Sequence, residues 1–398
     1  MADQETPPES VFTPSVPAVR NFVNRPDLLR AIDGAFRTPG KQIVLYGETG
    51  GGKTSAAIHT LFVRLDRPYV RVQCQPAYST TDLIKAIFDE MWRVLRVPVS
   101  DAGIGYIPQR ARAAPPQLPQ SPTPKALVEA CGNLGVTVVV DDYEKTRDRS
   151  VKREVANLAK EFSDRGAELP GRLLIVGIHE SPGLMIRLDE SLNRRLVQIP
   201  VPLFSDAEIR LIFVDGFAKL DIKRAPRIVE ELVVLSGGYG GYAHDLGLRL
   251  AWEALGRPSR SISPIDVGTI VERLLADNEA SFGDLYDHRI RQDPTSSMQL
   301  RQMTCEAIAL AGKRSLDAND VAEAVQQLAY RWWGGGVEIK PRSVRAELTK
   351  LSEPSEGYPE ILVREGTKGR YRYRYRNMMF RTYVRWEYDR RSRGKPLR

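Results

Sequence analysis

The stretch QIVLYGETGGGKT, residues 42–54, joins a short apolar run to the pattern GxxxxGK[ST], which extends from Gly47 to Thr54. Residues 55–65 (SAAIHTLFVRL) then open a helix. Glycines let successive backbone N–H groups point toward one phosphate, and the start of a helix adds its dipole. A strand, a glycine-rich loop and a helix in this order predict a phosphate-binding loop; a chance glycine-rich turn is the alternative.

Two side chains of this loop have expected roles with a nucleoside triphosphate. Lys53 is placed to reach the β- and γ-phosphates, and the Thr54 hydroxyl to hold Mg²⁺. We therefore expect ATP and Mg²⁺ as cofactors. The residues expected around the phosphates are Gly47, Glu48, Thr49, Gly50, Gly51, Gly52, Lys53, Thr54 and Ser55.

A second motif, VVVDD at residues 138–142, is typical of the strand that carries the metal-binding carboxylate. Asp141 is expected to bind Mg²⁺ through water. Asp142 stands where the residue that polarises the attacking water is usually found, and Glu144 is a weaker candidate for that role. A pair of aspartates at a strand end is also ordinary turn chemistry.

Buried strands show as continuous apolar runs, and their alternation with helices predicts an α/β fold with a parallel sheet. The runs are residues 42–47, 69–74, 136–142, 172–178 and 196–201. Because residues 69–74 lie between the two motifs, the order favours the additional-strand class of P-loop ATPases over nucleoside kinases and GTPases.

Two further positions are candidate parts of an active site. His179, Glu180 and Ser181 follow strand 172–178, where a polar side chain would sense the γ-phosphate; a simple exit from strand to loop is the alternative. Arg194 and Arg195 precede the last strand. One of them would stabilise charge on a neighbouring subunit's γ-phosphate, or both only end a helix in solvent.

The chain divides into four predicted parts. Residues 1–18 are polar and proline-rich, which predicts a flexible tail. The ATPase core follows at 19–201, with a proline-rich inserted loop at 97–123. Residues 202–280 predict a helical lid that begins with a capping box between Ser205 and Glu208. Residues 281–398 predict three helices and a hairpin, the order of a winged helix-turn-helix.

The charge of the chain is concentrated in that last part. Lys and Arg number 58 and Asp and Glu 50, for a net charge of +8, and residues 361–398 carry 13 basic against 3 acidic residues. Strict alternation in RYRYRYR, residues 370–376, places the arginines on one face and the tyrosines on the other. DNA is the expected partner, and docking of a protein is the alternative. The expected contacts are Arg342, Arg345, Lys350, Lys368, Arg370, Arg372, Arg374 and Arg376.

The composition excludes several classes of protein. A content of 42% hydrophobic and 27% charged residues does not suit a disordered chain. No apolar run approaches the length of a membrane span, and the first residues carry no secretory signal. Three widely spaced cysteines suit a reduced compartment and match no metal-site spacing. We therefore expect a cytoplasmic protein without a membrane partner.

Six segments together resemble the AAA+/STAND-type P-loop ATPases over residues 19–260. They are VPAVRNFVNRPDLLRAI, GETGGGKT, VVVDDYE, LLIVGIHES, NRRL and SGGYGGYAHDLGLRLAWEAL. The resemblance implies that Arg25 lies near the adenine, that His179 belongs to the sensor position, and that Tyr242 and His244 face the nucleotide or pack the lid. Asn24 and Gly240 depart from the usual Gly and Pro.

The function implied is an ATP-hydrolysing switch. Its turnover is expected to be slow and stimulated by a partner, with nucleotide-dependent homo-oligomers and a winged helix that binds DNA, as in archaeal origin-recognition ATPases. The alternative is a signalling ATPase, for example in bacterial defence, that docks a separate effector or trigger protein without DNA. A nucleotide-binding scaffold without turnover is a third possibility.

Overall fold

The computed structural model describes residues 6–96, 105–106, 123–146, 148–166, 170–178, 190–291, 299–334, 337–355, 357–367 and 369–393. They form two compact units. The N-terminal unit comprises Met1–Ile222 and Gly238–Trp252, and the C-terminal unit comprises Lys223–Gly237 and Glu253–Arg398. Residues 202–280 are therefore divided between the two units and do not form the separate lid that the sequence predicted.

The N-terminal unit is built on a six-stranded sheet. Its strands are β1 (Gln42–Tyr46), β2 (Tyr69–Gln73), β3 (Gly105–Tyr106), β4 (Thr137–Asp141), β5 (Arg172–Ile178) and β6 (Leu196–Pro200), in the order β3-β2-β4-β5-β1-β6. All neighbours pair in parallel except β2 and β3. Because β5 separates β1 from β4, the predicted additional-strand class is confirmed.

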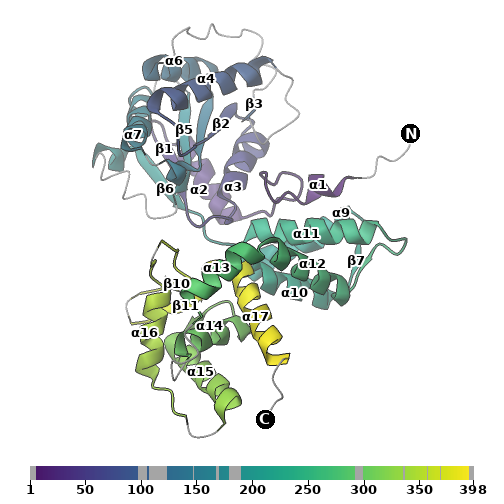
Figure 1. Ribbon diagram of the computed structural model, residues 1–398. Helices are drawn as coiled ribbons and strands as arrows, with labels where there is room; N and C mark the ends of the chain where they lie inside the picture. The colour runs from purple at the N-terminus through teal and green to yellow at the C-terminus, as the bar shows by residue number, and fades with distance from the viewer. Residues whose placement is uncertain are drawn as a thin grey trace. The chain divides into compact units, whose positions relative to one another are not determined.

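Helices cover both faces of this sheet (Figure 1). One face packs against α4 (Thr80–Arg96), α6 (Pro124–Leu134) and α7 (Arg149–Asp164), and the other against α2 (Pro26–Arg37), α3 (Lys53–His59) and the π-helical turn η1 (Thr60–Arg64). Val138 and Val140 face the first cluster and Val139 the second, which is why the strand is apolar without alternation. Two 3-10 turns, η2 (Tyr143–Lys145) and η3 (Glu190–Arg194), follow β4 and precede β6.

The beginning of the described chain packs on two helices of the same unit. Residues 8–18, called the N-terminal strap here, start with the short helix α1 (Pro8–Val11). Phe12 is fully buried, with its ring centroid 5.2 Å from that of Phe217 in α9 (Asp206–Lys219) and 6.1 Å from that of His244 in α11 (Gly240–Leu255). The predicted flexible tail is therefore wrong for residues 6–18.

The C-terminal unit combines seven described helices with two small sheets. The helices are α10 (Pro226–Ser236), α12 (Pro264–Asp277), α13 (Glu279–Arg289), α14 (Leu300–Leu310), α15 (Ala318–Trp333), α16 (Pro341–Leu351) and α17 (Met378–Arg393). The hairpin of β10 (Leu362–Glu365) and β11 (Arg372–Tyr375) is joined by β9 (Leu316–Asp317), in the order β10-β11-β9. The short strands β7 (Lys223–Arg224) and β8 (Ser261–Ile262) pair in parallel.

This arrangement contains the three helices and the hairpin expected from the sequence. The elements of this unit that the sequence did not predict are β7, β8, β9 and α13. α17 packs against α10, α12, α13 and α14, so two helices of the predicted lid belong to the core of the C-terminal unit. The predicted insertion, 97–123, lies outside the described residues except for β3 and Thr123, which caps α6. Within the described ranges, no helix is long and apolar enough to cross a bilayer.

Candidate nucleotide-binding cleft

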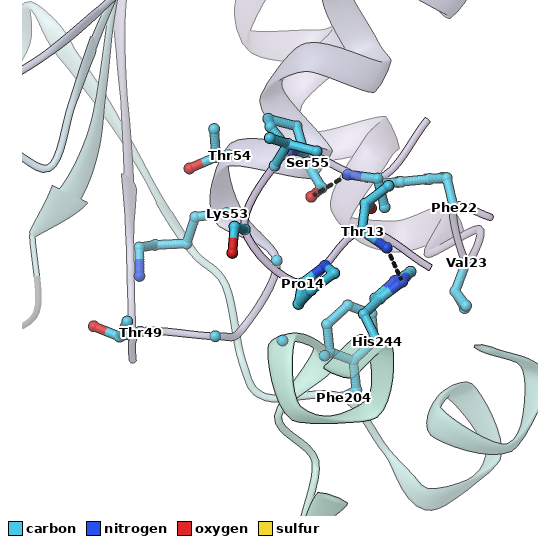
Figure 2. A pocket seen from close by; sticks show the side chains of 18 of the residues that line it. Thr13, Pro14, Phe22, Val23, Thr49, Lys53, Thr54, Ser55, Phe204 and His244 are labelled. Atoms are coloured by element: carbon cyan, nitrogen blue, oxygen red, sulfur yellow. Dashed lines mark hydrogen bonds between the residues drawn. The ribbon is translucent and has the colours of Figure 1, made fainter. Parts of the chain in front are cut away.

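A cleft of about 280 Å³ opens in the N-terminal unit at the carboxyl end of β4, beside the start of α3 (Figure 2). Ligands of open parallel sheets bind at this edge. The strap and residues 21–23 form one wall, and the phosphate-binding loop forms another. The lining residues are Thr13, Pro14, Ser15, Val16, Pro17, Ala18, Asn21, Phe22, Val23, Thr49, Gly50, Gly52, Lys53, Thr54, Ser55, Arg71, Asp141, Asp142, Glu144, Phe204, Ile212, Gly240, Gly241 and His244.

The predicted loop presents its backbone to the cleft. Gly50 and Gly52 have φ angles of 82° and 81°, in the left-handed region, and α3 begins at Lys53 directly after them. The first N–H groups of a helix have no carbonyl partner within it, so they remain available to an anion. A Cβ on Gly52 would lie 2.8 Å from the Phe204 ring, so no larger residue fits there without displacing that ring.

Lys53 is folded back onto the loop. Its Nζ donates to the carbonyl oxygens of Gly47 at 2.9 Å and Glu48 at 2.8 Å, and only 8% of the residue is exposed. Burial lowers the pKa of the Lys53 ammonium, and the nearby carboxylates, Glu144 first, act in the opposite direction. The ammonium therefore lies at the loop as a partly desolvated donor. Gly47, Glu48 and Gly51 shape the loop without lining the cleft.

Arg25 does not face the cleft, contrary to the expectation from the resemblance. Its guanidinium donates to the carbonyl oxygens of Gly51 at 3.0 Å and Pro202 at 2.8 Å, and to Glu208 at 3.2 Å. It also lies 4.7 Å from the ring centroid of Phe204. Nε, Nη1 and Nη2 of Arg25 each donate a hydrogen bond, and only 6% of the residue is exposed. Arg25 therefore fixes the phosphate-binding loop to the segment before α9 and is not a direct ligand of the nucleotide.

The two residues predicted to hold the metal lie together. The Thr54 hydroxyl donates to both carboxylate oxygens of Asp141 at 3.1 Å, and Asp141 is 2% exposed. A third residue, Arg71 of β2, was not predicted. Its Nη2 and Nε lie 2.7 and 2.8 Å from Oδ2 of Asp141. Only the parallel register of β2 and β4 brings Arg71 to this carboxylate, and the sequence carries no local signal for it.

The two candidate bases differ in their surroundings. Asp142 accepts from Gln73 at 2.6 Å and pairs with Lys145 at 2.6 Å, and these contacts outweigh burial and lower its pKa. Glu144 makes no ion pair with another described residue, and burial raises the pKa of its carboxyl group. A Cβ at Gly177, which has a φ of 104°, would clash with the Glu144 carboxylate. Gly177 therefore leaves room for Glu144 beside the cleft.

The strap is hydrogen-bonded to both sides of the cleft. The Thr13 N–H donates to Nδ1 of His244 at 3.1 Å, and the Ala18 N–H donates to Oγ of Ser55 at 3.1 Å (Figure 2). Burial, with a smaller contribution from Lys219, lowers the pKa of His244 to about 4, so its imidazole is neutral near pH 7. His244 lines the cleft, whereas Tyr242 does not and packs its ring 5.5 Å from that of Tyr239.

The segment before α11 is tied to the phosphate-binding loop. The Tyr239 hydroxyl donates to Glu48 at 2.9 Å, and the Gly240 N–H donates to the carbonyl oxygen of Gly50 at 3.0 Å. These bonds fix the first turn of α11 against the loop. The residue that departs from the usual Pro, Gly240, uses its N–H in this contact, which a proline could not make.

These residues fit a nucleoside triphosphate with Mg²⁺. The start of α3 supplies donors for phosphates, and Thr54 with Asp141 supplies the oxygen ligands that Mg²⁺ prefers. Val16, Val23 and Ile212 provide an apolar wall for a base.

Neither Arg194, the last residue of η3, nor Arg195, which follows it, lines the cleft. Arg195 pairs with Asp164 at 2.7 Å and donates to the Ser191 carbonyl oxygen, so its side chain is used within the unit. The Arg194 side chain is exposed at the end of η3. His179, with Glu180 and Ser181, lies outside the described residues.

A second candidate site is a groove of about 730 Å³ in the C-terminal unit. Three of the predicted nucleic-acid contacts, Arg345, Arg370 and Arg372, line it between α15, α16 and the hairpin. Arg342 and Lys350 are exposed on α16, where Lys350 pairs with Glu347 at 2.8 Å. The remaining lining residues are Asp317, Ala318, Asn319, Thr349, Arg364, Gly369, Tyr371 and Tyr373.

Arg374 contradicts the predicted exposed face of arginines. It is 1% exposed and pairs with Glu365, and its neighbours Tyr373 and Tyr375 are buried as well. Three consecutive buried residues mean that both faces of β11 are covered, so the period-two prediction fails here. Arg376 pairs with Glu360 and is two-thirds buried, and Lys368 lies outside the described residues.

No family model matches the sequence, and no curated protein matches it. Solved structures do match, and two of those that cover nearly the whole chain are compared with it below. The Walker-type ATPase PABY2304 of Pyrococcus abyssi has a TM-score of 0.50 and 15% identity, covering 92% of this chain and 96% of that chain. The ORC2 protein of Aeropyrum pernix, in ADPNP–ADP complexes, has a TM-score of 0.50 and 16% identity, covering 98% and 99%. The chain therefore has the fold of these two proteins, a Walker-type ATPase and an ORC2 protein, which agrees with the fold class predicted from the sequence.

Proposed function

We propose that this protein binds and hydrolyses ATP with Mg²⁺, and that its nucleotide state controls self-assembly and a basic, DNA-binding winged helix. The observation that carries the proposal is the contact between Thr54 and Asp141 at the start of a helix whose N–H groups face a cleft. Hydrogen-bond donors for phosphate and ligands for the metal thus already lie beside each other.

The hydrolysis step follows from the groups that line the cleft. The backbone of the loop and Lys53 bind and orient the phosphates. Mg²⁺, held by Thr54 and by Asp141 through water, would neutralise phosphate charge. Glu144 takes the proton of the attacking water, because its carboxylate is not committed to another described side chain and its raised pKa makes it a stronger base. Asp142 is held by Lys145 and Gln73, so we assign it the role of fixing the shape of the loop after β4.

The path of the chain supports coupling between nucleotide and winged helix. α10 belongs to the C-terminal unit, and the chain returns to the N-terminal unit at Gly237–Gly238, where φ is 54° and 85°. The next two residues, Tyr239 and Gly240, are hydrogen-bonded to the phosphate-binding loop. A displacement of that loop is thus transmitted to a two-glycine segment that joins the units.

Self-assembly is proposed from the position of Arg194. Its side chain is exposed at the end of η3 and does not line the cleft of its own subunit. In a ring or filament, such a side chain can reach the γ-phosphate bound by a neighbour and stabilise the charge of the transition state. Turnover would then be slow in the monomer and faster in the assembly.

The winged helix is proposed from the order α14-β9-α15-α16-β10-β11 and from the basic groove. In this reading α16 is the recognition helix, and Arg345, Arg370 and Arg372 contact phosphates. Contacts of this kind give affinity without sequence preference, and they weaken steeply as salt rises.

The test compares ATP turnover with and without duplex DNA at several salt concentrations. We expect stimulation by DNA that falls as salt rises, and loss of DNA binding when Arg345 and Arg370 are both replaced by Gln. The control is Arg331→Gln, which changes an exposed arginine of α15 outside the groove. ATP turnover that does not change with DNA at any salt concentration would contradict the proposal that the winged helix binds DNA. Absence of any ATP turnover would contradict hydrolysis and would favour a nucleotide-binding scaffold.

One observation favours the alternative of a signalling ATPase that docks a separate protein. Tyr330 and Trp333, one turn apart on α15, are 65% and 42% exposed. Exposed aromatic side chains of this kind often anchor protein partners. If DNA has no effect while Trp333→Ala abolishes stimulation by a cell extract that activates the wild type, the alternative replaces the DNA-binding proposal.

A further inference from the structure

We propose that Arg71 is a built-in counter-cation of the metal site, which neutralises Asp141 in the metal-free protein and must leave it when Mg²⁺ binds. The inference rests on the proposed function and concerns the same cleft. It assigns to Arg71 a role in setting how strongly ATP binding depends on metal.

The first step is the geometry of the pair. Nη2 and Nε of Arg71 both lie within 2.8 Å of Oδ2 of Asp141, and the Thr54 hydroxyl lies 3.1 Å from each oxygen of the same carboxylate. Residues opposite each other in a parallel pair point to the same face, and Gln73 is opposite Asp141. Arg71, two residues earlier on β2, shares that face, so its long side chain extends along the strand to the carboxylate.

The second step is the need for a cation at this place. Asp141 is 2% exposed, and a buried carboxylate is unfavourable unless it is paired and hydrogen-bonded. Two other cations lie near it: Lys53 donates its hydrogen bonds to the carbonyl oxygens of Gly47 and Glu48, and Lys145 pairs with Asp142. Among the described ion pairs, Arg71 is the partner of Asp141. Arg71 therefore supplies the charge compensation that the metal supplies in the loaded site.

The third step is the competition that follows. Arg71 and the water shell of Mg²⁺ both require the Asp141 carboxylate as a hydrogen-bond acceptor, and the two cations repel each other, so one cation weakens the binding of the other. The side chain of Arg71 lines the cleft and is 20% exposed, so it remains among the phosphates when it leaves Asp141. Arg71 thus supports nucleotide binding without metal and reduces the additional affinity that metal provides.

The test measures equilibrium binding of a fluorescent ATP analogue in EDTA and in Mg²⁺. The quantity compared is the dissociation constant in EDTA divided by the dissociation constant in Mg²⁺. Arg71→Gln removes the charge and keeps a hydrogen-bond donor, and Arg71→Lys keeps the charge. We expect Arg71→Gln to raise the ratio about tenfold or more, and Arg71→Lys to stay within about threefold of wild type. The matched control is Arg249→Gln, which breaks an ion pair with Asp245 away from the cleft.

An unchanged ratio in Arg71→Gln overturns the proposal, and so does an equal shift in Arg71→Gln and Arg71→Lys, because shape and not charge would then be responsible. Absence of binding by the wild type under both conditions refutes the proposed function instead. Should Arg71→Gln not fold, Asp141→Asn is compared with and without Arg71→Gln in EDTA. The added change is expected to weaken metal-free binding about tenfold, and equal affinities would overturn the proposal.

Discussion

Phe12 allows a direct test of whether the strap is part of the folded unit. Its ring is fully buried and packs against Phe217 and His244. Removing a buried phenylalanine side chain costs about 3–5 kcal/mol of unfolding free energy when the site cannot collapse. Phe12→Ala is therefore expected to lower the stability of the N-terminal unit by about 3 kcal/mol and to weaken ATP binding, since the strap lines the cleft.

The slot that receives Phe12 supplies a second arm of the experiment. A Cβ at Gly247 would clash with the ring, so Gly247→Ala alone is expected to destabilise the unit by about 1–3 kcal/mol. In the Phe12→Ala background the same methyl group fills part of the cavity, and alanine has a higher helix propensity than glycine in α11. There, Gly247→Ala is expected to stabilise by about 1 kcal/mol, a reversal of sign.

The assay is hydrogen exchange by mass spectrometry of peptides from α9 and α11, because it measures the stability of these helices separately from that of the C-terminal unit. Glu9→Gln is the control, since Glu9 lies in the same strap, is exposed and does not line the cleft. If Phe12→Ala changes the protection of α9 and α11 by less than about 1 kcal/mol and leaves ATP affinity unchanged, residues 6–18 behave as the flexible tail expected from composition.

Three other predictions concern the chemistry and stability of single groups. Glu144→Gln is expected to lower kcat for ATP about 100-fold with ATP affinity within about threefold, and Asp142→Asn to lower it less than tenfold; the reverse order would reassign the base. Because the pKa of His244 is lowered to about 4, the unfolded chain takes up a proton first as pH falls below about 6.5. The free energy of unfolding of the N-terminal unit should fall by up to about 3 kcal/mol between pH 6.5 and 4. Denaturation measurements on His244→Gln check this, and the same fall in that variant would refute the prediction. The hydrogen bond from Arg257 lowers the pKa of Asp266 to about 2, so this stabilisation is complete above about pH 4 and is lost toward pH 2. Thermal unfolding of Asp266→Asn at pH 7 should show a loss of about 1–2 kcal/mol in the C-terminal unit, discounted because Arg257 is 42% exposed, and an unchanged stability would contradict the assignment.

The parts of the fold that were predicted from the sequence depend on local patterns. The strand at residues 136–142 was recognisable because β4 is buried on both faces. All residues of β4 between its two polar ends are therefore apolar. The capping box was recognisable because Ser205 and Glu208 satisfy each other within one turn. The phosphate-binding loop was recognisable because it needs glycine at fixed positions.

The parts that were missed depend on partners far away in the sequence. The burial of Phe12 requires a slot formed by two helices about 200 residues later, and composition alone showed only a proline-rich tail. Arg71 meets Asp141 through strand register, 70 residues apart. Arg374 alternates correctly with the tyrosines, but packing on both faces of β11 buries it, and alternation cannot reveal a second covered face.

Binding of ATP in the cleft through Lys53 and the start of α3 is measured by calorimetric titration of ATP with Mg²⁺. Wild type, Lys53→Ala and the control Lys85→Ala, which changes an exposed lysine of α4, are compared. We expect the wild type and Lys85→Ala to bind ATP with equal affinity, and Lys53→Ala to bind it at least about tenfold more weakly. Wild-type protein that does not bind ATP, or Lys53→Ala that binds it as tightly as the wild type, would contradict this mode of binding.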